Sequence, residues 1–478
     1  MGIDLFQLVQ PGFEAAPLNP AIITPHGQSV TYKKLHLTIQ SFCERLEEAG
    51  VIPGNRVTTD IRNPSVVIAL VLALSRLGAV YIAGSTPRGI QKAGITVDVV
   101  VSDTIRPRGN VKEVLLTQAW SATNGRMSKS MTGFSDENAI AAILASSGTT
   151  GTPKFMAFPV SLIRQRLDDH DTVHGQGRSK CLITFGLNSP FGLELSLRVL
   201  RLGGMIAWPV ESALQTLQQV AAHGVTEIYA APGTLAELAH QQRRSKFDLS
   251  SLTRIVTAGS GIASWQVELA RQNLAPVILN EYGSSELGPV SCIEIGTASE
   301  TPGTVGAPAP WIDVRVDASS GKLLLKGEGN RLPENYLNTC TDKTMASQDG
   351  WFVPGDTGYL DEMGRLVITG RDNDLINTGG NKISARVLEE TISTLPGIDA
   401  CAVLPIPNEY GYDDIGLALV CTTGHDKDHL RRQLSASYEN TAKIRILYLN
   451  ELPKLAGGKT DLQTLKKLVS KTRRLELE

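Results

Sequence analysis

Short apolar runs and amphipathic, helix-like segments alternate along this chain up to about residue 300, and this alternation restricts its fold more than any other feature. The apolar runs have the length of strands buried in a sheet, and they include Val97–Val101, Cys181–Phe185, Glu227–Ala231 and Arg254–Thr257. Helix-like segments such as Leu214–His223 and Trp265–Gln272 lie between such runs. Strands that alternate with helices form mainly parallel sheets covered by helices, so the sequence predicts an α/β fold.

The pattern changes after about residue 300. Short strands at Val314–Val316, Leu323–Leu325 and Leu366–Ile368 stand among glycine-rich turns and predict a small β-rich subdomain. The charged stretch Arg371–Asp374 is typical of a domain boundary. The segments beyond it predict helices at Ala385–Leu395, at His429–Ser437 and after Asp461, and strands at Ala400–Leu404, Ile415–Val420 and Ile444–Leu449. We therefore expect a large domain over residues 1–370 and a small α+β domain over residues 371–478.

Length and composition agree with a protein of at least two domains. A chain of 478 residues exceeds a single hydrophobic core of usual size. The 46 basic and 48 acidic residues give a net charge of −2, which offers no electrostatic case for binding nucleic acid or an anionic membrane. The six scattered cysteines indicate reduced core thiols. The longest apolar run, Val66–Leu74, is too short to span a bilayer, and no secretory signal is visible, so we expect a cytoplasmic protein.

The segment Ser146–Lys154 reads Ser-Ser-Gly-Thr-Thr-Gly-Thr-Pro-Lys and follows an apolar, strand-like run. Gly148 and Gly151 lack a Cβ, so backbone N–H groups can turn toward an anion. The hydroxyls of Thr149, Thr150 and Thr152 can donate hydrogen bonds to a phosphate, Lys154 adds a positive charge, and Ser146 and Ser147 belong to the same loop. A strand-like run, Phe155–Phe158, follows where a Walker A loop would open a helix. The segment is interpreted as a phosphate-binding loop of another kind, with a flexible polar linker as the alternative.

Four later segments carry the residue types of a nucleotide site. They are Asn280–Glu286 (Asn-Glu-Tyr-Gly-Ser-Ser-Glu), Trp351–Asp356 (Trp-Phe-Val-Pro-Gly-Asp), Gly370–Gly380, which ends in Thr-Gly-Gly, and Pro453–Lys459 (Pro-Lys-Leu-Ala-Gly-Gly-Lys). In this order and spacing, together with the phosphate loop, they resemble the core motifs of the adenylate-forming enzymes. That family comprises acyl- and aryl-CoA synthetases, peptide-synthetase adenylation domains and luciferases. The resemblance extends from Thr31 to Lys459, which is nearly the whole chain.

The resemblance implies a large N-terminal adenylation domain, a small mobile C-terminal domain and a two-step reaction. A carboxylate attacks the α-phosphate of ATP and expels pyrophosphate, and a thiol then captures the acyl adenylate. Lys459 takes the position of the family's catalytic lysine, and Arg371 that of an arginine near ribose and phosphate. Glu286 takes the position of the Mg²⁺ ligand. The alternatives are a solvated lysine, a surface ion pair and an exposed turn glutamate, respectively.

The same resemblance assigns the nucleotide site and the path of the thiol. Asp356 corresponds to the carboxylate that accepts hydrogen bonds from both ribose hydroxyls; the alternative is an aspartate that only stabilises a turn. Asn280 and Tyr282 offer an amide and an aromatic face to adenine. The other implied nucleotide positions are Gly259, Ser260, Gly261, Glu281, Gly283, Ser285 and Ile368; Asn373 takes the hinge position, and Gly379 and Gly380 lie where the pantetheine of coenzyme A passes. The alternative interpretation of Gly380 is a loop glycine that contacts no ligand.

The acid substrate is the least specified part of the sequence. Amino-acid-activating members of the family carry an aspartate near the position of Pro190, so a free α-amino acid is not expected. The histidine found nearby in many CoA synthetases is replaced as well, by Ser189 or Asn188. By analogy, the acid pocket is lined by Ser189, Gly192, Ala230 and Ala231. Small side chains there predict room for an aryl, fatty or polycyclic acid.

These observations predict an acid–CoA ligase, monomeric or homodimeric, that uses ATP, Mg²⁺ and coenzyme A and acts on a small carboxylic acid. The nearest alternative is an adenylating enzyme that loads the thiol of a separate carrier protein. A third alternative is an ATP-binding regulator without turnover. The family usually has aspartate or lysine at the position of Asn373, histidine near Ser189, and proline at the position of Ala385. These departures would be the symptoms of such a regulator.

Overall fold

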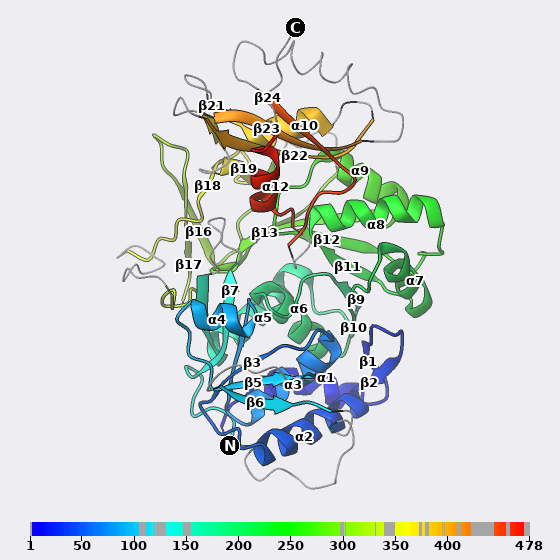
Figure 1. Ribbon diagram of the computed structural model, residues 1–478, viewed down its shortest axis with the longest axis vertical. Helices are drawn as coiled ribbons and strands as arrows, with labels where there is room; N and C mark the ends of the chain where they lie inside the picture. Colours follow the sequence, from blue (N-terminus) through cyan, green and yellow to red (C-terminus); the bar gives the residue numbers. More distant parts are fainter. Residues whose placement is uncertain are drawn as a thin grey trace.

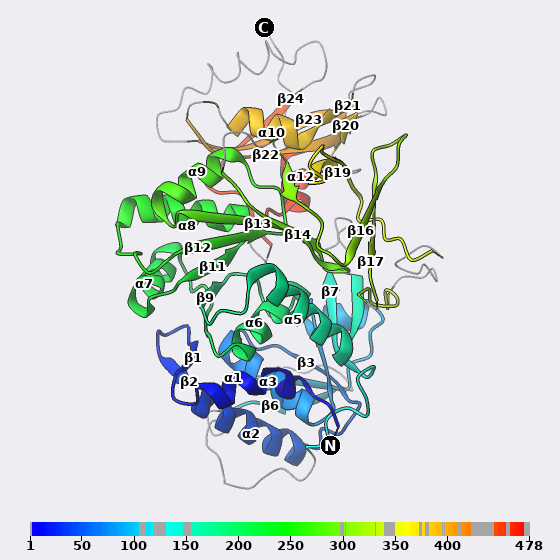
Figure 2. The ribbon, with the colours of Figure 1, turned by 180° about the vertical axis from the view of Figure 1, so that it is seen from behind.

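The computed structural model describes residues 2–104, 111–117, 120, 131–146, 154–296, 301, 303–329, 331–338, 349–371, 375–377, 382–393, 395, 397–408, 413–421, 444–455 and 459–472. Figures 1 and 2 show the chain from opposite sides, with the N-terminal sheets and helices at the bottom and the C-terminal sheet at the top. The mixture of parallel sheets and covering helices confirms the predicted α/β fold. In the described part of the chain, no helix has the length and apolar character needed to cross a bilayer.

An eight-stranded sheet forms the middle of the molecule. Its order is β14 (Gly288–Glu294), β13 (Val277–Ser284), β12 (Arg254–Ala258), β11 (Glu227–Ala230), β9 (Lys180–Ile183), β10 (Met205–Ala207), β1 (Pro20–Ile23) and β2 (Ser29–Thr31). Strands β13 to β1 pair in parallel, whereas β14 and β2 join the two edges antiparallel. The parallel strands place the carboxyl ends of β12 and β13 side by side, and Thr257 lies opposite Asn280 in their register.

A six-stranded sheet lies on the N-terminal side. Its order is β6 (Lys112–Leu115), β5 (Val99–Ser102), β3 (Arg56–Thr59), β4 (Val80–Ala83), β7 (Ile140–Ser146) and β8 (Lys154–Pro159). All neighbours are parallel except β7 and β8, which form an antiparallel pair in which Ser146 lies opposite Lys154. The predicted second strand after the phosphate loop is therefore present as β8.

The two large sheets share one hydrophobic core with helices that pack between and around them. These helices are α1 (Leu5–Ala15), α2 (Tyr32–Glu48), α3 (Pro64–Arg76), α5 (Val160–His174) and α6 (Pro190–Arg201). A second core on the eight-stranded sheet is covered by α7 (Ala213–His223), α8 (Pro232–Ser245) and α9 (Ser264–Asn273), and α4 (Pro87–Lys92) covers the six-stranded sheet. Helix α3 contains the apolar run predicted to be a buried helix. It begins at Pro64, where Asn63 caps it by accepting a hydrogen bond from the Ser65 backbone.

The β-rich part after residue 300 consists of a three-stranded sheet and a ribbon. The sheet has the order β15 (Thr304–Gly306), β19 (Leu366–Arg371) and β18 (Asp356–Leu360), and the ribbon pairs β16 (Ile312–Val316) with β17 (Leu323–Gly327). These strands enclose a core that includes Trp311 and Phe352. Because β18 begins at Asp356 and β19 ends at Arg371, antiparallel pairing sets these two residues opposite each other.

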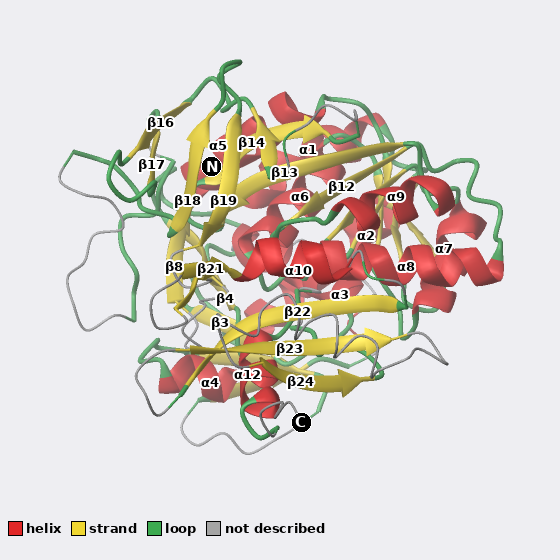
Figure 3. Ribbon diagram, turned by 90° about the horizontal axis from the view of Figure 1, so that it is seen from above, coloured by secondary structure: helices red, strands yellow, loops and turns green. Residues whose placement is uncertain are grey.

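The C-terminal unit is built on a three-stranded sheet. Its elements are β20 (Leu375–Asn377), β21 (Lys382–Ser384), α10 (Ala385–Ser393), β22 (Ile398–Pro407), β23 (Asp413–Cys421), β24 (Ile444–Leu449) and α12 (Leu462–Val469). Helix α10 packs on one face of the β22–β24 sheet, and α12 packs on the other. Figures 1 and 2 both place α12 between this sheet and the rest of the molecule, and Figure 3 shows the sheet from above. The predicted helix at His429–Ser437 lies outside the described residues, and the boundary at residues 370 and 371 stays a prediction.

Candidate active site

The predicted phosphate loop connects β7 to β8. Ser146 is buried at the end of β7, and Lys154 begins β8 directly opposite it. The Lys154 ammonium lies 4.9 Å from the centre of the Tyr336 ring, an attractive cation–π arrangement. The loop's two ends are thus fixed by sheet pairing. Ser147, Gly148, Thr149, Thr150 and Gly151 lie outside the described residues.

The carboxyl ends of β12 and β13 carry the predicted adenine positions. Gly259 follows β12 with a φ of 89°, a backbone conformation that favours glycine. Asn280 and Glu281 are buried, and Tyr282 is half-buried. The Glu281 carboxylate contacts His174 on α5, so this side chain points into the protein beneath the predicted nucleotide site.

Asp356 stands at the centre of a hydrogen-bonded group on the predicted ribose side. Its Oδ2 accepts a hydrogen bond from the Tyr282 hydroxyl at 2.7 Å, and its Oδ1 accepts one from Arg371 Nε at 2.7 Å. Burial and the carboxylate raise the pKa of Tyr282 well above its ordinary value, so the phenol stays protonated and donates. The aspartate is buried, whereas the arginine side chain is 46% exposed. The structure therefore joins three of the sequence-predicted residues in one contact group.

Lys459 reaches this group from the C-terminal unit. Its Cε lies 2.6 Å, and its Nζ 3.3 Å, from the place that a Cβ on Gly259 would occupy, so only glycine leaves room for the lysine there. Burial lowers the pKa of Lys459, and the Arg371 guanidinium lowers it further, whereas Glu286 and Asp356 act in the opposite direction. The lysine is half-buried, and its catalytic role stays a prediction. A second lysine on the same segment, Lys454, forms an ion pair with Glu237 on α8.

Glu286 is held by a residue that the sequence reasoning missed. The Tyr336 hydroxyl donates a 2.8 Å hydrogen bond to Glu286 Oε1, and the same ring lies under the Lys154 ammonium. Tyr336 also pairs with β8 through Met156. A tyrosine outside any recognised motif gave no signal in the sequence, because its role depends on a pairing between segments 180 positions apart. The predicted metal ligand and the phosphate-loop lysine are therefore parts of one contact chain.

The other predicted nucleotide residues lie around this centre. Ser260, Gly261 and Gly283 are exposed, Ser285 is half-buried, and Ile368 is buried in the β-rich core. At Gly283 an added Cβ would lie 2.3 Å from the Gly288 carbonyl oxygen, so the turn between β13 and β14 is too close for a side chain. The hinge residue Asn373 and the coenzyme A positions Gly379 and Gly380 lie outside the described residues. Their roles stay predictions.

The residues assigned to the acid pocket have clear structural roles. Ser189 caps α6: its hydroxyl accepts a hydrogen bond from the Gly192 backbone at 3.2 Å and donates one to the Gly186 carbonyl at 2.9 Å. A Cβ on Gly192 would lie 2.2 Å from the Gly186 carbonyl oxygen. Ala230 and Ala231 are fully buried in the cores on either face of the eight-stranded sheet. Whether these four residues also line an acid pocket stays a prediction.

A buried row of polar residues on α5 underlies the site, and the sequence analysis did not identify it. Arg166 donates to the backbone carbonyls of Glu286 and Arg331, and Asp169 accepts two hydrogen bonds from Arg331 at 3.0 Å. On the same helix Asp171 pairs with Arg198, His170 contacts Glu194, and His174 contacts Glu281. The signal available in the sequence was the spacing, since Arg166, Asp169, His170 and His174 stand at positions i, i+3, i+4 and i+8, which share one helix face.

Glu286 and Asp356 lie within electrostatic range of Lys459, which stands at the Gly259 turn after the parallel strand β12. This arrangement and the α/β fold agree with one class of protein, the AMP-binding enzymes. The family of AMP-binding enzymes matches residues 12–330, and the chain belongs to this family.

The 4-chlorobenzoate–CoA ligase of Arthrobacter sp. is 25% identical over 96% of this chain and 94% of that protein. The 2-succinylbenzoate–CoA ligase of Bacillus cereus is 26% identical over 92% of this chain and 94% of its own. The crystal structure of ATP-bound MatB from Rhodopseudomonas palustris superposes with a TM-score of 0.82 at 19% identity, covering 98% of this chain and 99% of that chain. This last likeness concerns the fold.

Proposed function

We propose that this protein is an acid–thiol ligase that activates a non-amino carboxylic acid with ATP, as acyl-AMP, and transfers the acyl group to coenzyme A. The observation that carries the proposal is the position of Lys459, whose ammonium lies at the Gly259 turn within electrostatic range of Glu286 and Asp356. Several curated relatives are named as CoA ligases of aryl acids, which supports an aryl acid as the first substrate to test. A cytoplasmic location is part of the proposal, because the reaction consumes ATP and a thiol cosubstrate.

The geometry suggests a role for each side chain in the first step. Lys459 stabilises the negative charge that develops on the α-phosphoryl oxygens when the carboxylate attacks. Asp356 orients the ribose, because a carboxylate with one hydrogen bond on each oxygen still has lone pairs for two hydroxyls. Arg371 fixes that carboxylate and adds positive charge on the same side.

The residues around Glu286 fit a magnesium ion. The Tyr336 phenol donates to one oxygen of the Glu286 carboxylate, and the carboxylate is a hard oxygen ligand; Mg²⁺ in proteins uses one or two carboxylates together with substrate phosphates. Bound there, Mg²⁺ would compensate the charge of the phosphates. Tyr336 would hold the carboxylate for that purpose through its hydroxyl, and the same residue contacts β8 through Lys154 and Met156.

Pyrophosphate exchange tests the proposal. Wild-type protein is incubated with ATP, labelled pyrophosphate and a panel of aryl, fatty, polycyclic and amino acids, with and without Mg²⁺. We expect exchange with at least one neutral acid and none without a divalent cation. Glu286→Gln should lower the exchange at least tenfold, since it removes an ionised ligand, whereas Glu294→Gln, an exposed glutamate on β14, should not. Exchange without any divalent cation, or with amino acids alone, would contradict the proposal.

The thiol acceptor is decided in a second experiment. Coenzyme A or a pantetheinylated carrier protein is added to enzyme that has formed its adenylate, and the thioester is measured by mass spectrometry. Transfer to coenzyme A is expected. Transfer to the carrier protein alone would favour the carrier-loading alternative, and ATP binding without exchange would favour the regulator.

A further inference from the structure

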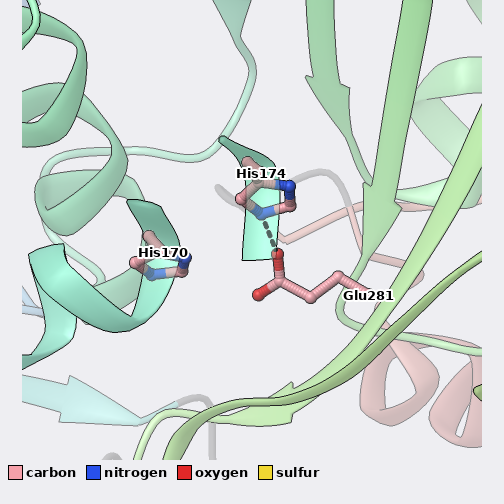
Figure 4. Close-up of side chains that lie close together, drawn as sticks. All are labelled: His170, His174 and Glu281. Carbon is pink, nitrogen blue, oxygen red and sulfur yellow. Dashed lines mark hydrogen bonds and ion pairs between the residues drawn. The ribbon is translucent and has the colours of Figure 1, made fainter. Parts of the chain in front are cut away.

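Two histidines and two glutamates meet in the interior between α5, α6 and β13. His170 and His174 lie one turn apart on α5, with ring planes 13° from parallel and centroids 5.9 Å apart. Glu281 of β13 approaches His174, with 2.6 Å between Oε2 and Nε2, and Glu194 of α6 lies 3.3 Å from His170 Nε2. Figure 4 shows both imidazoles projecting from α5 toward the side from which Glu281 arrives. All four side chains are buried, at 5% exposure or less.

The cluster has coordinating atoms that the described residues do not satisfy. His170 Nδ1, His174 Nδ1 and Glu194 Oε1 are buried and make no hydrogen bond within the described part of the chain. One ligand atom each from His170, His174 and Glu281 lies within 4.8 Å of the others. Ligands at about 2.0–2.2 Å from a tetrahedral metal ion are themselves roughly 3.5 Å apart, so rotamer shifts of about 1 Å would close this set. Buried polar atoms in native proteins normally have a hydrogen-bond partner or a bound ion, so these three atoms are expected to have one as well.

The charges of the cluster favour a cation. The neighbouring carboxylates Asp169 and Asp171 pair with arginines. By contrast, the side-chain partners of Glu194 and Glu281 within the described ranges are imidazoles. Arg166 lies within electrostatic range of Glu194, but its guanidinium donates to backbone carbonyls. Arg198 lies within electrostatic range of Glu281, but it pairs with Asp171.

The chemistry of the donors indicates which kind of cation fits. Two imidazole nitrogens four residues apart on a helix, completed by a glutamate, form a set that binds zinc and related first-row metals. The contact between Glu194 and His170 Nε2 leaves Nδ1 of that ring free to coordinate. A carboxylate that orients a metal-bound histidine in this way is the usual outer partner of such sites. Magnesium, which prefers oxygen ligands, does not match this set.

We propose that His170, His174 and Glu281 form a buried site for a divalent transition-metal ion, with Glu194 as the carboxylate that orients His170. The ion would tie α5 to β13, the strand that carries Asn280 and Tyr282 toward the nucleotide. The site is separate from the magnesium position proposed at Glu286. The bound ion would therefore hold in place the buried residues of α5 and β13 that lie beneath the nucleotide site.

Cobalt provides a direct probe. Full-length protein is stripped of metal by chelation, and Co²⁺ is titrated while the visible absorption of nitrogen-coordinated cobalt is recorded; Zn²⁺ binding is measured by calorimetry. We expect one equivalent of each, displacement of Co²⁺ by Zn²⁺ but not by millimolar Mg²⁺, and a higher thermal unfolding midpoint with the metal bound. His170→Asn, His174→Asn and Glu281→Gln should each weaken binding at least tenfold, and Glu194→Gln should weaken it about 10–100-fold.

Two controls separate this site from others. His240→Asn, which removes a histidine on α8 outside the cluster, and Glu286→Gln should bind cobalt as the wild type does. The unfolding curve of each metal-free variant checks that it is folded. If one variant does not fold, the remaining variants and the wild-type spectrum decide. No stoichiometric cobalt spectrum in the wild type, or unchanged binding in the folded cluster variants, would overturn the proposal without affecting the proposed ligase activity.

Discussion

At the scale of single residues, the active site is arranged around carboxylates whose oxygens are already engaged. Asp356 has a phenol on one oxygen and a guanidinium on the other, and Glu286 has a phenol on one oxygen. Such donors fix the orientation of a carboxylate before a ligand arrives, so less side-chain entropy is lost on binding. Of the two tyrosines, only Tyr282 could be identified from the sequence, because it belongs to a recognisable motif and Tyr336 does not.

Replacing Tyr336 by phenylalanine tests the role of its hydroxyl. The ring that faces Lys154 is retained, and only the donor to Glu286 is lost. We expect the Mg²⁺ concentration needed for half-maximal pyrophosphate exchange to rise about 10–100-fold, the usual effect of removing a group that orients a metal ligand. Tyr359→Phe, at an exposed position on β18, is the matched control. An unchanged Mg²⁺ requirement in Tyr336→Phe would show that the hydroxyl does not orient the ligand.

The protonation of Lys459 gives a second prediction at this scale. Its pKa lies below the ordinary value of 10.5, and only the protonated form stabilises developing negative charge. The kcat/KM of adenylation reports the free enzyme, so it should fall as pH rises through the lowered pKa, before an ordinary lysine would lose its proton. Lys459→Arg should keep reduced activity and lose this alkaline decline, because a guanidinium stays protonated. An identical alkaline decline in both proteins would assign it to another group.

At the scale of elements, α5 follows β8 of the six-stranded sheet and contacts β13 of the eight-stranded sheet. Helix α5 contributes apolar residues to the core and also buries Arg166, Asp169, His170, Asp171 and His174. Each of these polar side chains contacts a residue on another segment of the chain, so α5 links those segments through buried polar contacts. Removing one partner of a buried pair leaves an uncompensated charge and is far more disruptive than removing one at the surface.

Two arginines permit a matched comparison. Arg198 pairs with Asp171, and both side chains are at most 3% exposed, whereas Arg164 pairs with Glu137, where both are at least 35% exposed. We expect Arg198→Met to lower the free energy of unfolding by about 3–5 kcal/mol, and Arg164→Met to lower it by about 1 kcal/mol or less. Urea unfolding followed by tryptophan fluorescence measures both. Equal, small losses in both variants would mean that the buried polar contacts of α5 stabilise the protein no more than a surface ion pair does.

At the scale of the whole molecule, the C-terminal unit places Lys459 at the Gly259 turn and forms the Lys454–Glu237 ion pair with α8. In the proposed mechanism, this is the arrangement in which the adenylate forms. The thiol step requires another set of residues, for which the resemblance points to Gly379 and Gly380. A rotation of the small domain between two such arrangements therefore remains a proposal, with Asn373 as its hinge.

Half-reactions measured separately test this rotation. Lys459→Ala should lower adenylate formation by up to about a thousandfold, the loss seen when one strong electrostatic contact to the transition state is removed. It should still convert a supplied acyl adenylate to the thioester. Gly380→Leu should do the reverse, because its side chain would block the thiol's path. Equal losses in both half-reactions would instead indicate a shared site or a folding defect, and the rotation would have to be abandoned for this protein.

The sequence by itself determined the α/β class and most element positions, because these depend on local periodicity and turn chemistry. Ser146 was named from the residue types of its loop, whereas Gly259, Tyr282, Glu286, Asp356 and Lys459 were named from the resemblance of their motifs to the adenylate-forming enzymes. The structure places Tyr282 against Asp356 and Lys459 at Gly259. Only the tertiary structure decided what joins them: Tyr336 at Glu286, and the meeting of α5, α6 and β13 around His170 and His174. These partners come from segments far apart in the chain, and the burial that makes a histidine or glutamate unusual exists only once those segments pack together.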